Sequence, residues 1–454
     1  NGRASNSTFN IDANGVTAGV NGSVGLITFE EITNLIGGAG DDTFVVSAGV
    51  TAIGLLDGGA TGVNTIDLRN IVNGQVVSLT GTGTGTGFAG VVAGVATSFD
   101  NITSLQAPVA ASSLTGADID ATWTINAASG RYDDDGGTQF VDFSGFNQFN
   151  GGAASDTMNV TTSRVANLTG GDGDDVVTLL PNVTVSGSVN LGAGADSLTL
   201  GSTSGFTGSA IGGADADTLS HAGATGPVNV TVDAINAVPT DGFNGTSTGL
   251  LLAGPSTNPG FFGFNRFVAT GSANDTLTSN INTANADWLL NENLAGTQSS
   301  ELRTGGQTAT FRLFDSLIGA NMDDRFEIQD GAQVLPASID GGTGANTLAG
   351  NATATAFSVT GTDEGTAMLG VLNLAFTNVG TLEGGTAGDT FSFDVAGTLT
   401  GAIDGGVGAP NTVSGDANGN SFAINTANTG TINNGLGSVA FQRVQNLNGG
   451  AGVD

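Results

Sequence analysis

The sequence has no cysteine, no lysine and a single histidine among its 454 residues. Without cysteine, the fold can contain neither disulfide bridges nor thiolate zinc sites. All nine basic residues are arginines, against 41 acidic residues, which gives a formal net charge of −32. Nucleic acids and anionic membrane surfaces are bound through basic patches, so this charge balance argues against both partners.

Long apolar runs and a targeting segment are also missing. No stretch approaches the roughly 18 consecutive apolar residues that a membrane-spanning helix needs. The first residues do not have the pattern of a signal peptide, and the chain stops at GGAGVD, inside a motif that recurs throughout. We therefore expect a piece of a longer exported protein that is secreted or displayed on the cell surface, outside the cell.

Glycine and aspartate are abundant instead. The 76 glycines, and acidic residues that are mostly aspartate, favour tight turns. Apolar residues make up 39% of the chain and alternate with polar ones in segments such as TFSFDV, residues 390 to 395. This alternation indicates folded β-strands rather than disorder, and no segment predicts substantial helix.

The stretch GGAGDDTFVV, residues 37 to 46, recurs along the chain and shows a short period. One series of motif aspartates is almost evenly spaced, and a second series pairs a strong motif with a weaker asparagine copy at one constant separation. Both spacings are close to the period of roughly 20 residues that is typical of one coil of a β-solenoid. The first series is Asp156, Asp175, Asp196 and Asp217, and the second is Asp42 with Asn64, Asp324 with Asn346 and Asp389 with Asn411.

A longer period separates Asp324, Asp389 and Asp454 by equal lengths of chain. A phenylalanine precedes the motif aspartate at one constant separation in six copies, and an aromatic–x–aliphatic triplet lies further upstream. We interpret this as a super-repeat of roughly three coils. The phenylalanines are Phe29, Phe143, Phe262, Phe311, Phe376 and Phe441, and the triplets begin at Phe9, Trp123, Trp288, Phe357 and Phe422.

The predicted fold class is all-β: one continuous right-handed parallel β-solenoid, or β-helix, over residues 1–454, with about 20 residues per coil. About 21 coils stacked at roughly 4.8 Å would give a rod on the order of 100 Å long. An irregular excursion is expected over about 222–268, where prolines cluster. Its phenylalanines, within residues 261–267, either fill the core or form a lateral contact surface. RYDDDGGTQ, residues 131–139, is expected to be an exposed loop.

Two copies of the motif, GGAGDDTFV (37–45) and GGDGDDVVT (170–178), fit the calcium-binding nonapeptide G-G-x-G-x-D-x-U-x. The chain here resembles the RTX family of exported bacterial proteins, and this resemblance implies Ca²⁺ as a cofactor, held between the turns of neighbouring coils. Carried over position by position and extended to the most acidic stack of turns, the implied metal ligands are Asp42, Asp156, Asp172, Asp174, Asp175, Asp196, Asp215, Asp217, Asp324 and Asp389.

The departures from that family matter for the cation prediction. There is one motif per coil rather than a tandem pair, Asn346 stands where the aspartate is expected, and Ala154 and Ala387 replace glycines. The whole chain looks more like the giant bacterial β-strand-repeat exoproteins with a haemagglutinin-like β-helix. Since Ca²⁺ takes six to eight oxygen ligands, a site needs carboxylates from stacked turns. The alternative is that each Asp or Asn only caps the N–H groups of its own turn.

No catalytic constellation is expected. The lone His221 is predicted to lie on the surface, and aspartates are spread evenly instead of converging on one groove. We expect an extracellular structural protein, such as a bacterial adhesin stalk, filament or sheath, that self-associates into fibres or surface layers. The alternatives are a calcium-dependent carbohydrate-binding module and a polysaccharide-degrading β-helix enzyme, whose ligand would be a polysaccharide or another cell-surface molecule.

Overall fold

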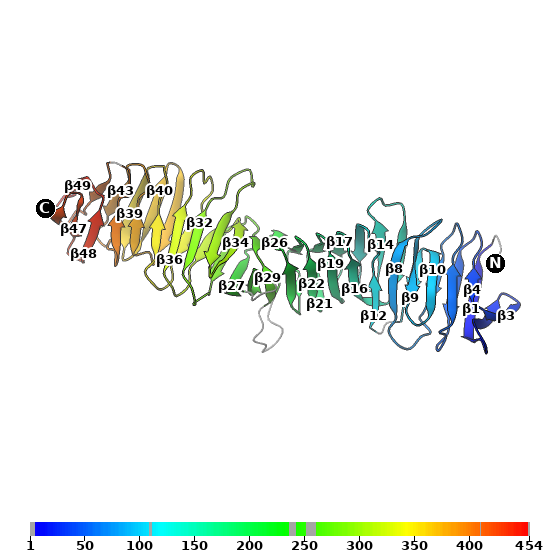
Figure 1. Ribbon diagram of the computed structural model, residues 1–454. Coiled ribbons are helices and arrows are strands. Elements are labelled where there is room, and N and C mark those ends of the chain that lie inside the picture. Colours follow the sequence, from blue (N-terminus) through cyan, green and yellow to red (C-terminus); the bar gives the residue numbers. More distant parts are fainter. Residues whose placement is uncertain (1–4, 109–110, 236–241, 251–259, 409, 453–454) are drawn as a thin grey trace. The chain divides into compact units, whose positions relative to one another are not determined.

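The computed structural model describes the chain except residues 1–4, 109–110, 236–241, 251–259, 409 and 453–454. Strands joined by turns make up this described part, and it contains no helix (Figure 1). Accordingly, no helix there is long and apolar enough to cross a membrane. Most strands pair in parallel within long sheets. The predicted all-β fold class is therefore confirmed.

The chain divides into two compact units, and the first comprises residues 1–219 and 249–261. Its strands belong to two long sheets, called A and B below, and to a short third sheet. Sheet A holds β1 (Ser7–Asn14), β2 (Val20–Val24), β3 (Ile27–Ile32), β5 (Asp42–Val46), β7 (Thr65–Asp67), β11 (Ser104–Gln106), β13 (Ala121–Ile125), β14 (Ser129–Asp134), β15 (Phe140–Ser144), β17 (Asp156–Val160), β20 (Val176–Leu179) and β23 (Ser197–Gly201). Sheet B holds β4 (Asn34–Ile36), β6 (Ile53–Asp57), β8 (Val76–Thr82), β9 (Phe88–Val92), β10 (Ala96–Ile102), β12 (Ser112–Thr115), β16 (Phe146–Gly152), β19 (Asn167–Asp172), β22 (Val189–Ala193) and β25 (Ala210–Ala214). The short sheet holds β18 (Arg164–Val165), β21 (Thr184–Ser186) and β24 (Gly205–Phe206).

The second unit comprises residues 220–248 and 262–454. Sheet A here holds β30 (Arg266–Val268), β32 (Ala286–Leu290), β33 (Ser300–Thr304), β34 (Gln307–Arg312), β36 (Asp324–Ile328), β38 (Thr347–Ala349), β42 (Thr381–Glu383), β44 (Ala402–Asp404), β46 (Ser421–Thr426), β47 (Thr429–Asn433) and β48 (Ser438–Gln442). Sheet B holds β27 (Asn229–Ile235), β28 (Phe243–Ser247), β31 (Thr276–Ser279), β35 (Ser316–Ile318), β37 (Ser338–Asp340), β39 (Thr355–Gly361), β40 (Glu364–Leu369), β41 (Leu372–Thr377), β43 (Thr390–Phe393), β45 (Thr412–Ser414) and β49 (Asn446–Asn448). Two further strands, β26 (Thr218–Gly223) and β29 (Phe261–Phe264), lie where the chain passes between units.

Parallel neighbours in these sheets are separated by two characteristic lengths of chain. The shorter length joins Thr157 to its partner Val176 and Thr43 to its partner Thr65. The longer length is roughly twice as great, as between Thr347 and its partner Thr381. The short separations agree with the sequence period, and the long ones contain additional strands.

The additional strands form antiparallel three-stranded meanders. They are β1–β2–β3, β8–β9–β10 and β13–β14–β15 in the first unit, and β32–β33–β34, β39–β40–β41 and β46–β47–β48 in the second. In five of them a glycine of the middle strand lies opposite a phenylalanine of the last strand; the pairs are Gly22–Phe29, Gly90–Phe99, Gly130–Phe143, Gly365–Phe376 and Gly430–Phe441. The ring covers the glycine so closely that a Cβ at Gly130 would lie 2.3 Å from Phe143. This accounts for four of the six in-phase phenylalanines, Phe29, Phe143, Phe376 and Phe441, whereas Phe311 lies opposite Ser300.

The aromatic triplets begin the meanders and stack on the following parallel strand. Phe9 lies over Phe44 and Phe357 over Phe391, each with ring centroids 4.9 Å apart and nearly parallel planes. Trp288 stacks on Phe326 at 5.5 Å. Parallel in-register pairing places inward side chains above one another, so these aromatic pairs continue into aliphatic neighbours such as Ile66, Leu348 and Val413.

The super-repeat that separates Asp324 from Asp389 does not return to the same sheet. Asp324 begins β36 in sheet A, whereas Asp389 immediately precedes β43 in sheet B. The predicted super-repeat of roughly three coils is therefore not a whole number of returns to one sheet. Between the two aspartates the chain makes five passages from one sheet to the other, through β37, β38, the β39–β41 meander, β42 and β43. The odd number places Asp389 in the opposite sheet from Asp324.

Two local predictions need correction. The segment 131–139 is not simply an exposed loop: Arg131 to Asp134 belong to β14, and Tyr132 is fully buried against Trp123. Within 261–267, Phe261, Phe264 and Phe267 are fully buried, which supports the core-filling interpretation over a lateral contact surface. Residues 236–241 and 251–259 of the excursion predicted over 222–268 lie outside the described residues, as does Asp454.

Candidate functional site: a ladder of buried carboxylates

The motif aspartates and asparagines lie at the start of strands, and their side chains point into the fold. Each is at most 1% exposed. We call this set the inner ladder: Asp42, Asn64, Asp156, Asp175, Asp196, Asp217, Asp324, Asn346, Asp389 and Asn411. Three other predicted metal ligands, Asp172, Asp174 and Asp215, are exposed. The structure therefore separates the predicted ligand set into a buried group and a solvent-facing group.

Most inner-ladder side chains accept a backbone N–H from a parallel neighbour. The exceptions are Asp42, which bonds its own turn, and Asp156, whose Oδ1 accepts the indole N–H of Trp123. The Asp156 N–H donates to Asp175 Oδ1 at 2.8 Å, the Asp175 N–H to Asp196 Oδ1 at 2.7 Å, and the Asp196 N–H to Asp217 Oδ1 at 3.0 Å. An asparagine performs the same task after Asp324 and Asp389: Asn346 Oδ1 accepts at 2.9 Å and Asn411 Oδ1 at 2.8 Å. A buried amide needs a hydrogen-bond acceptor. These side-chain oxygens accept the backbone N–H at the start of each strand, where sheet pairing supplies no acceptor.

The second carboxylate oxygen serves the turn itself in several copies. Asp42 Oδ2 accepts the Gly38 N–H at 2.7 Å, and Asp324 Oδ2 accepts the Ala320 N–H at 2.7 Å. The first motif glycine leaves room for this oxygen, since a Cβ at Gly37 would lie 2.5 Å from it. The motif is thus a turn whose glycine makes space for its own aspartate, as the turn-capping alternative predicts.

The residue before the ladder position bonds in the opposite direction. Asp41 Oδ1 accepts the Val63 N–H at 2.7 Å, while the neighbouring Asp42 N–H donates to Asn64 Oδ1 at 3.2 Å. The same reciprocal pair recurs twice: Asp174 Oδ1 accepts from Ala195 at 2.8 Å, and Asp323 Oδ1 accepts from Ala345 at 2.7 Å. The double aspartate of GGAGDD therefore fastens two parallel strands with two hydrogen bonds of opposite sense, which we call the reciprocal clamp.

The run from Asp156 to Asp196 differs from the other ladder segments because it contains no asparagine. Its Oδ2 atoms on Asp156, Asp175 and Asp196 are buried and make no hydrogen bond to a described residue. Burial, assisted by the neighbouring carboxylates, raises the pKa of Asp156 and Asp175 to about 7 and that of Asp196 to about 6. Burial likewise raises the pKa of Asp324 to about 6.

These shifts predict that the protein loses stability as the pH rises from about 5 to 8. An aspartate with a raised native pKa holds its proton in the folded state while the unfolded chain, with an ordinary pKa near 4, is already ionised. The stabilisation is complete below about pH 4 and is lost progressively as the pH rises to 6 or 7, by roughly 1.4 kcal/mol per group per pH unit. Denaturant midpoints at pH 5 and pH 8 measure the loss. The triple variant D156N/D175N/D196N should show a flatter profile, and an unchanged profile would contradict the assignment.

Sequence reasoning missed ladder positions occupied by other residue types. Ser112 is fully buried and its Oγ accepts the Gln75 N–H at 3.0 Å, and Thr103 Oγ1 accepts the Asn64 N–H at 2.9 Å. Ser112 follows Phe99 at the same separation at which each motif aspartate follows its phenylalanine, so the phenylalanine was the available signal.

His221 is buried rather than on the surface, contrary to prediction. It is 2% exposed, and its Nε2 lies 2.8 Å from Ser247 Oγ and 3.0 Å from the Thr248 carbonyl oxygen. Burial lowers its pKa. Ser247 is only 5% exposed, so this contact holds β26 against the end of β28 inside the fold.

No group of three or more His, Cys, Asp or Glu side chains in the described part is arranged to hold a metal ion. No protein-family model matches the chain, and no curated protein matches it either.

Proposed function

We propose that the chain is a structural segment of an extracellular bacterial protein, built as a right-handed parallel β-solenoid. It combines short coils of about 20 residues with longer coils that carry a meander. The short parallel separations, such as that from Thr157 to Val176, support this winding. The RTX-like motifs and the resemblance to giant exoproteins supply the extracellular assignment.

The observation that carries this proposal is the reciprocal clamp. Asp41, Asp174 and Asp323 each bond the next parallel strand while the following residue is bonded back by it. The double-aspartate motif is thereby used to fasten strand to strand, and ligand binding needs no such repetition. Repeated contacts between neighbours are what give a stacked array its stability.

Surface labelling of the producing cells tests the location. Antibodies against the first unit, followed by gold labelling and electron microscopy, should mark the outer surface of intact cells or the material around them. Labelling that requires cell lysis would contradict an extracellular structural role.

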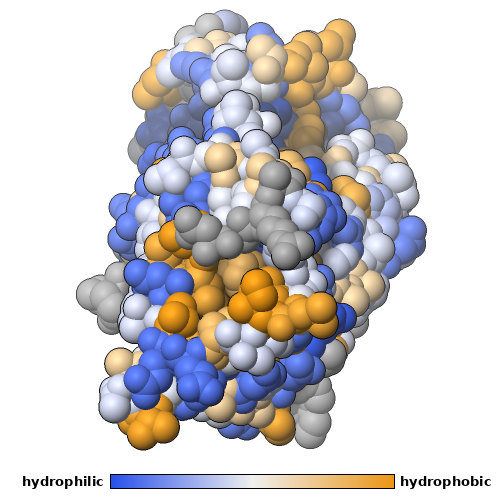
Figure 2. Space-filling view, turned by 90° about the vertical axis from the view of Figure 1, so that its right-hand side faces the viewer, coloured by the Kyte–Doolittle hydropathy of each residue, from blue (hydrophilic) through white to orange (hydrophobic). Residues whose placement is uncertain are grey.

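Self-association is part of the proposal. It is supported by strands that, among the described residues, pair with a neighbour along only one of their two edges. Among described residues, β3 pairs only with β2, and β46 only with β47. Leu26 and Ile27, at the turn that leads into β3, are exposed. Figure 2 faces the side of the first unit where β1 and β3 lie and shows hydrophobic patches among hydrophilic ones. An open strand edge accepts another strand, so fibres or layers formed by strand addition are expected.

Calcium stabilisation also remains a prediction from the sequence. We expect Ca²⁺ to raise the unfolding midpoint more than Mg²⁺ does at equal concentration and matched ionic strength. Chelation of Ca²⁺ should remove this rise. The exposed Asp172 and Asp174 allow a specific test, because their replacement by Asn spares the inner ladder. Equal effects of the two cations, or a calcium effect that persists in the variant without these carboxylates, would contradict calcium sites at this turn.

A further inference from the structure

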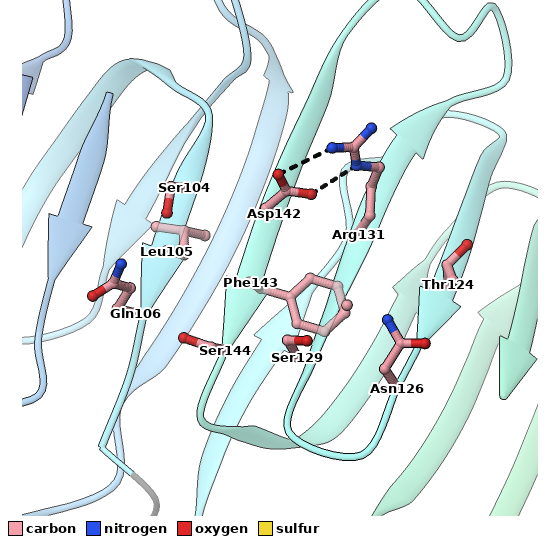
Figure 3. Close-up of a pocket in the computed structure, with 11 residues that line it drawn as sticks. Ser104, Leu105, Gln106, Thr124, Asn126, Ser129, Arg131, Asp142, Phe143 and Ser144 are labelled. Atoms are coloured by element: carbon pink, nitrogen blue, oxygen red, sulfur yellow. Dashed lines mark hydrogen bonds and ion pairs between the residues drawn. The ribbon is translucent and has the colours of Figure 1, made fainter. Parts of the chain in front are cut away.

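A polar hollow of about 440 Å³ opens on the outer face of sheet A in the first unit (Figure 3). Its walls come from four neighbouring strands in the order β11, β15, β14 and β13, which includes the β13–β14–β15 meander. Volumes of this size are typical of small-molecule sites. The inner ladder and the reciprocal clamp make no use of this surface.

The first row of side chains across the hollow consists of Ser104, Asp142, Arg131 and Thr124, in register from strand to strand. In its centre Arg131 holds Asp142 through two hydrogen bonds, Nε to Oδ1 at 2.7 Å and Nη2 to Oδ2 at 3.0 Å. The guanidinium also lies 4.0 Å over the ring of Phe140. Asp142 and the ring of Phe140 together fix the orientation of the guanidinium, and the Arg131–Asp142 pair carries no net charge.

The second row consists of Gln106, Ser144, Ser129 and Asn126. Asn126 donates its backbone N–H to the Ser129 carbonyl oxygen at 2.8 Å, which continues the register beyond the end of β13. Two amide side chains therefore flank two hydroxyls. Gln106 and Asn126 are longer than the two serines between them, so the second row is hollowed in its middle. The paired side chains of Arg131 and Asp142 bound this hollow on the side of the first row.

The polar groups of the hollow are available to a ligand. Among the described residues, the side chains of Ser104, Gln106, Ser129 and Ser144 make no hydrogen bond to protein, and all four are at least partly exposed. The Thr161 hydroxyl donates a hydrogen bond to Asn126 Oδ1. This bond fixes the orientation of the amide and leaves its Nδ2 group to donate to a ligand. Phe143 and Leu105 lie beneath and are buried, so they support the floor and offer no open aromatic face.

We propose that this hollow binds a neutral oligosaccharide. Hydroxyls, amides and a self-neutralised ion pair supply both donors and acceptors at close spacing, which suits the many hydroxyl groups of a sugar chain. The pairing of Arg131 with Asp142 leaves no free charge for a sulfated, uronic or amino sugar, and the net charge of −32 opposes anions further. Three strand spacings of about 4.8 Å give a span of about 14 Å, enough for a short oligosaccharide.

Isothermal titration calorimetry with neutral hexasaccharides of glucose, mannose and galactose, in α and β linkages, tests this site. We expect at least one to bind with a Kd on the order of 10⁻⁴ M, because recognition depends on hydrogen bonds without an aromatic platform. Oligogalacturonates of different lengths are the charged comparison ligands and should bind at least about tenfold more weakly.

Ser144→Trp fills the hollow and should weaken binding at least about tenfold. The matched control is Thr377→Trp, since both residues are exposed to some degree and follow the covering phenylalanine of a meander. If Ser144→Trp shifts the unfolding midpoint, Gln106→Ala replaces it as the test variant. The proposal is overturned if no neutral hexasaccharide binds at 10 mM, if the charged oligomers bind as well, or if the folded hollow variant binds like the wild type. Failure here leaves the structural role intact, because that role is tested by surface labelling.

Discussion

Replacing Asp175 by alanine is expected to lower the free energy of unfolding by about 3 kcal/mol or more. Asp175 is 1% exposed and its Oδ1 is the acceptor for the buried Asp156 N–H at 2.8 Å. Alanine would leave that amide without an acceptor and open a cavity between parallel neighbours. Both effects are costly in a fold whose layers depend on their contacts with the layers beside them.

Asp175→Asn is the informative counterpart. Its side-chain carbonyl can accept the same N–H, as Asn346 and Asn411 already do at equivalent positions. It also cannot ionise, so at pH 8 the variant should be at least as stable as the wild type, given that burial raises the pKa of Asp175 to about 7. Asp172→Ala, on the exposed side of the same turn, should change stability by less than about 0.5 kcal/mol.

Hydrogen exchange at the Asp156 amide gives the local readout. Denaturant midpoints alone are ambiguous for stacked arrays, which need not unfold in a single step. Protection of the Asp156 N–H should fall sharply in Asp175→Ala and persist in Asp175→Asn. Equal loss in both variants would mean that the carboxylate charge, rather than the acceptor oxygen, is what the ladder needs.

The second large effect is expected from Gly365→Val in the β39–β40–β41 meander. A Cβ at this position would lie 2.0 Å from the Ser358 carbonyl oxygen and 2.8 Å from the ring of Phe376. Neither neighbour can withdraw, since Ser358 belongs to the paired strand β39 and the Phe376 side chain is 1% exposed. We expect a loss of about 3 kcal/mol in the free energy of unfolding.

Gly226→Ala is the control in the same unit. Its Cβ would meet nothing within 4 Å, and its backbone does not lie in the left-handed region. Thermal melts followed by circular dichroism should show a midpoint close to that of the wild type for this variant. If the Gly365→Val protein is as stable as the control, the recurring phenylalanines do not require a glycine beneath their rings.

The pH dependence and the reciprocal clamp together lead to a prediction about the segment from Asp156 to Asp196. Where an asparagine follows the aspartate, as Asn64 follows Asp42 and Asn346 follows Asp324, the N–H of the aspartate has a neutral acceptor. The all-aspartate run has none, so deprotonation places like charges in adjacent buried positions. We expect this run to open first as the pH rises.

The sequence alone determined the features that depend on local chemistry and on repetition. Alternating apolar residues specify strands, glycines and aspartates specify turns, and parallel pairing needs the same residue types at the same phase in each passage. The sequence was therefore enough to predict three features: the all-β class, the shorter of the two separations between parallel strands, and the constant spacing of the phenylalanines.

Only the tertiary structure decided what those residues face. Direction is not encoded in a turn motif, so the burial of Asp42 and Asp175, the opposite senses of the reciprocal clamp and the interior position of His221 could not be read from spacing. The alternation of Asp324 and Asp389 between sheets follows from counting passages, which requires knowing that three strands of a meander share one sheet. The hollow beside Arg131 likewise exists only because register aligns short serines between longer side chains, on the meander strands and on β11, which precedes the meander in the sequence.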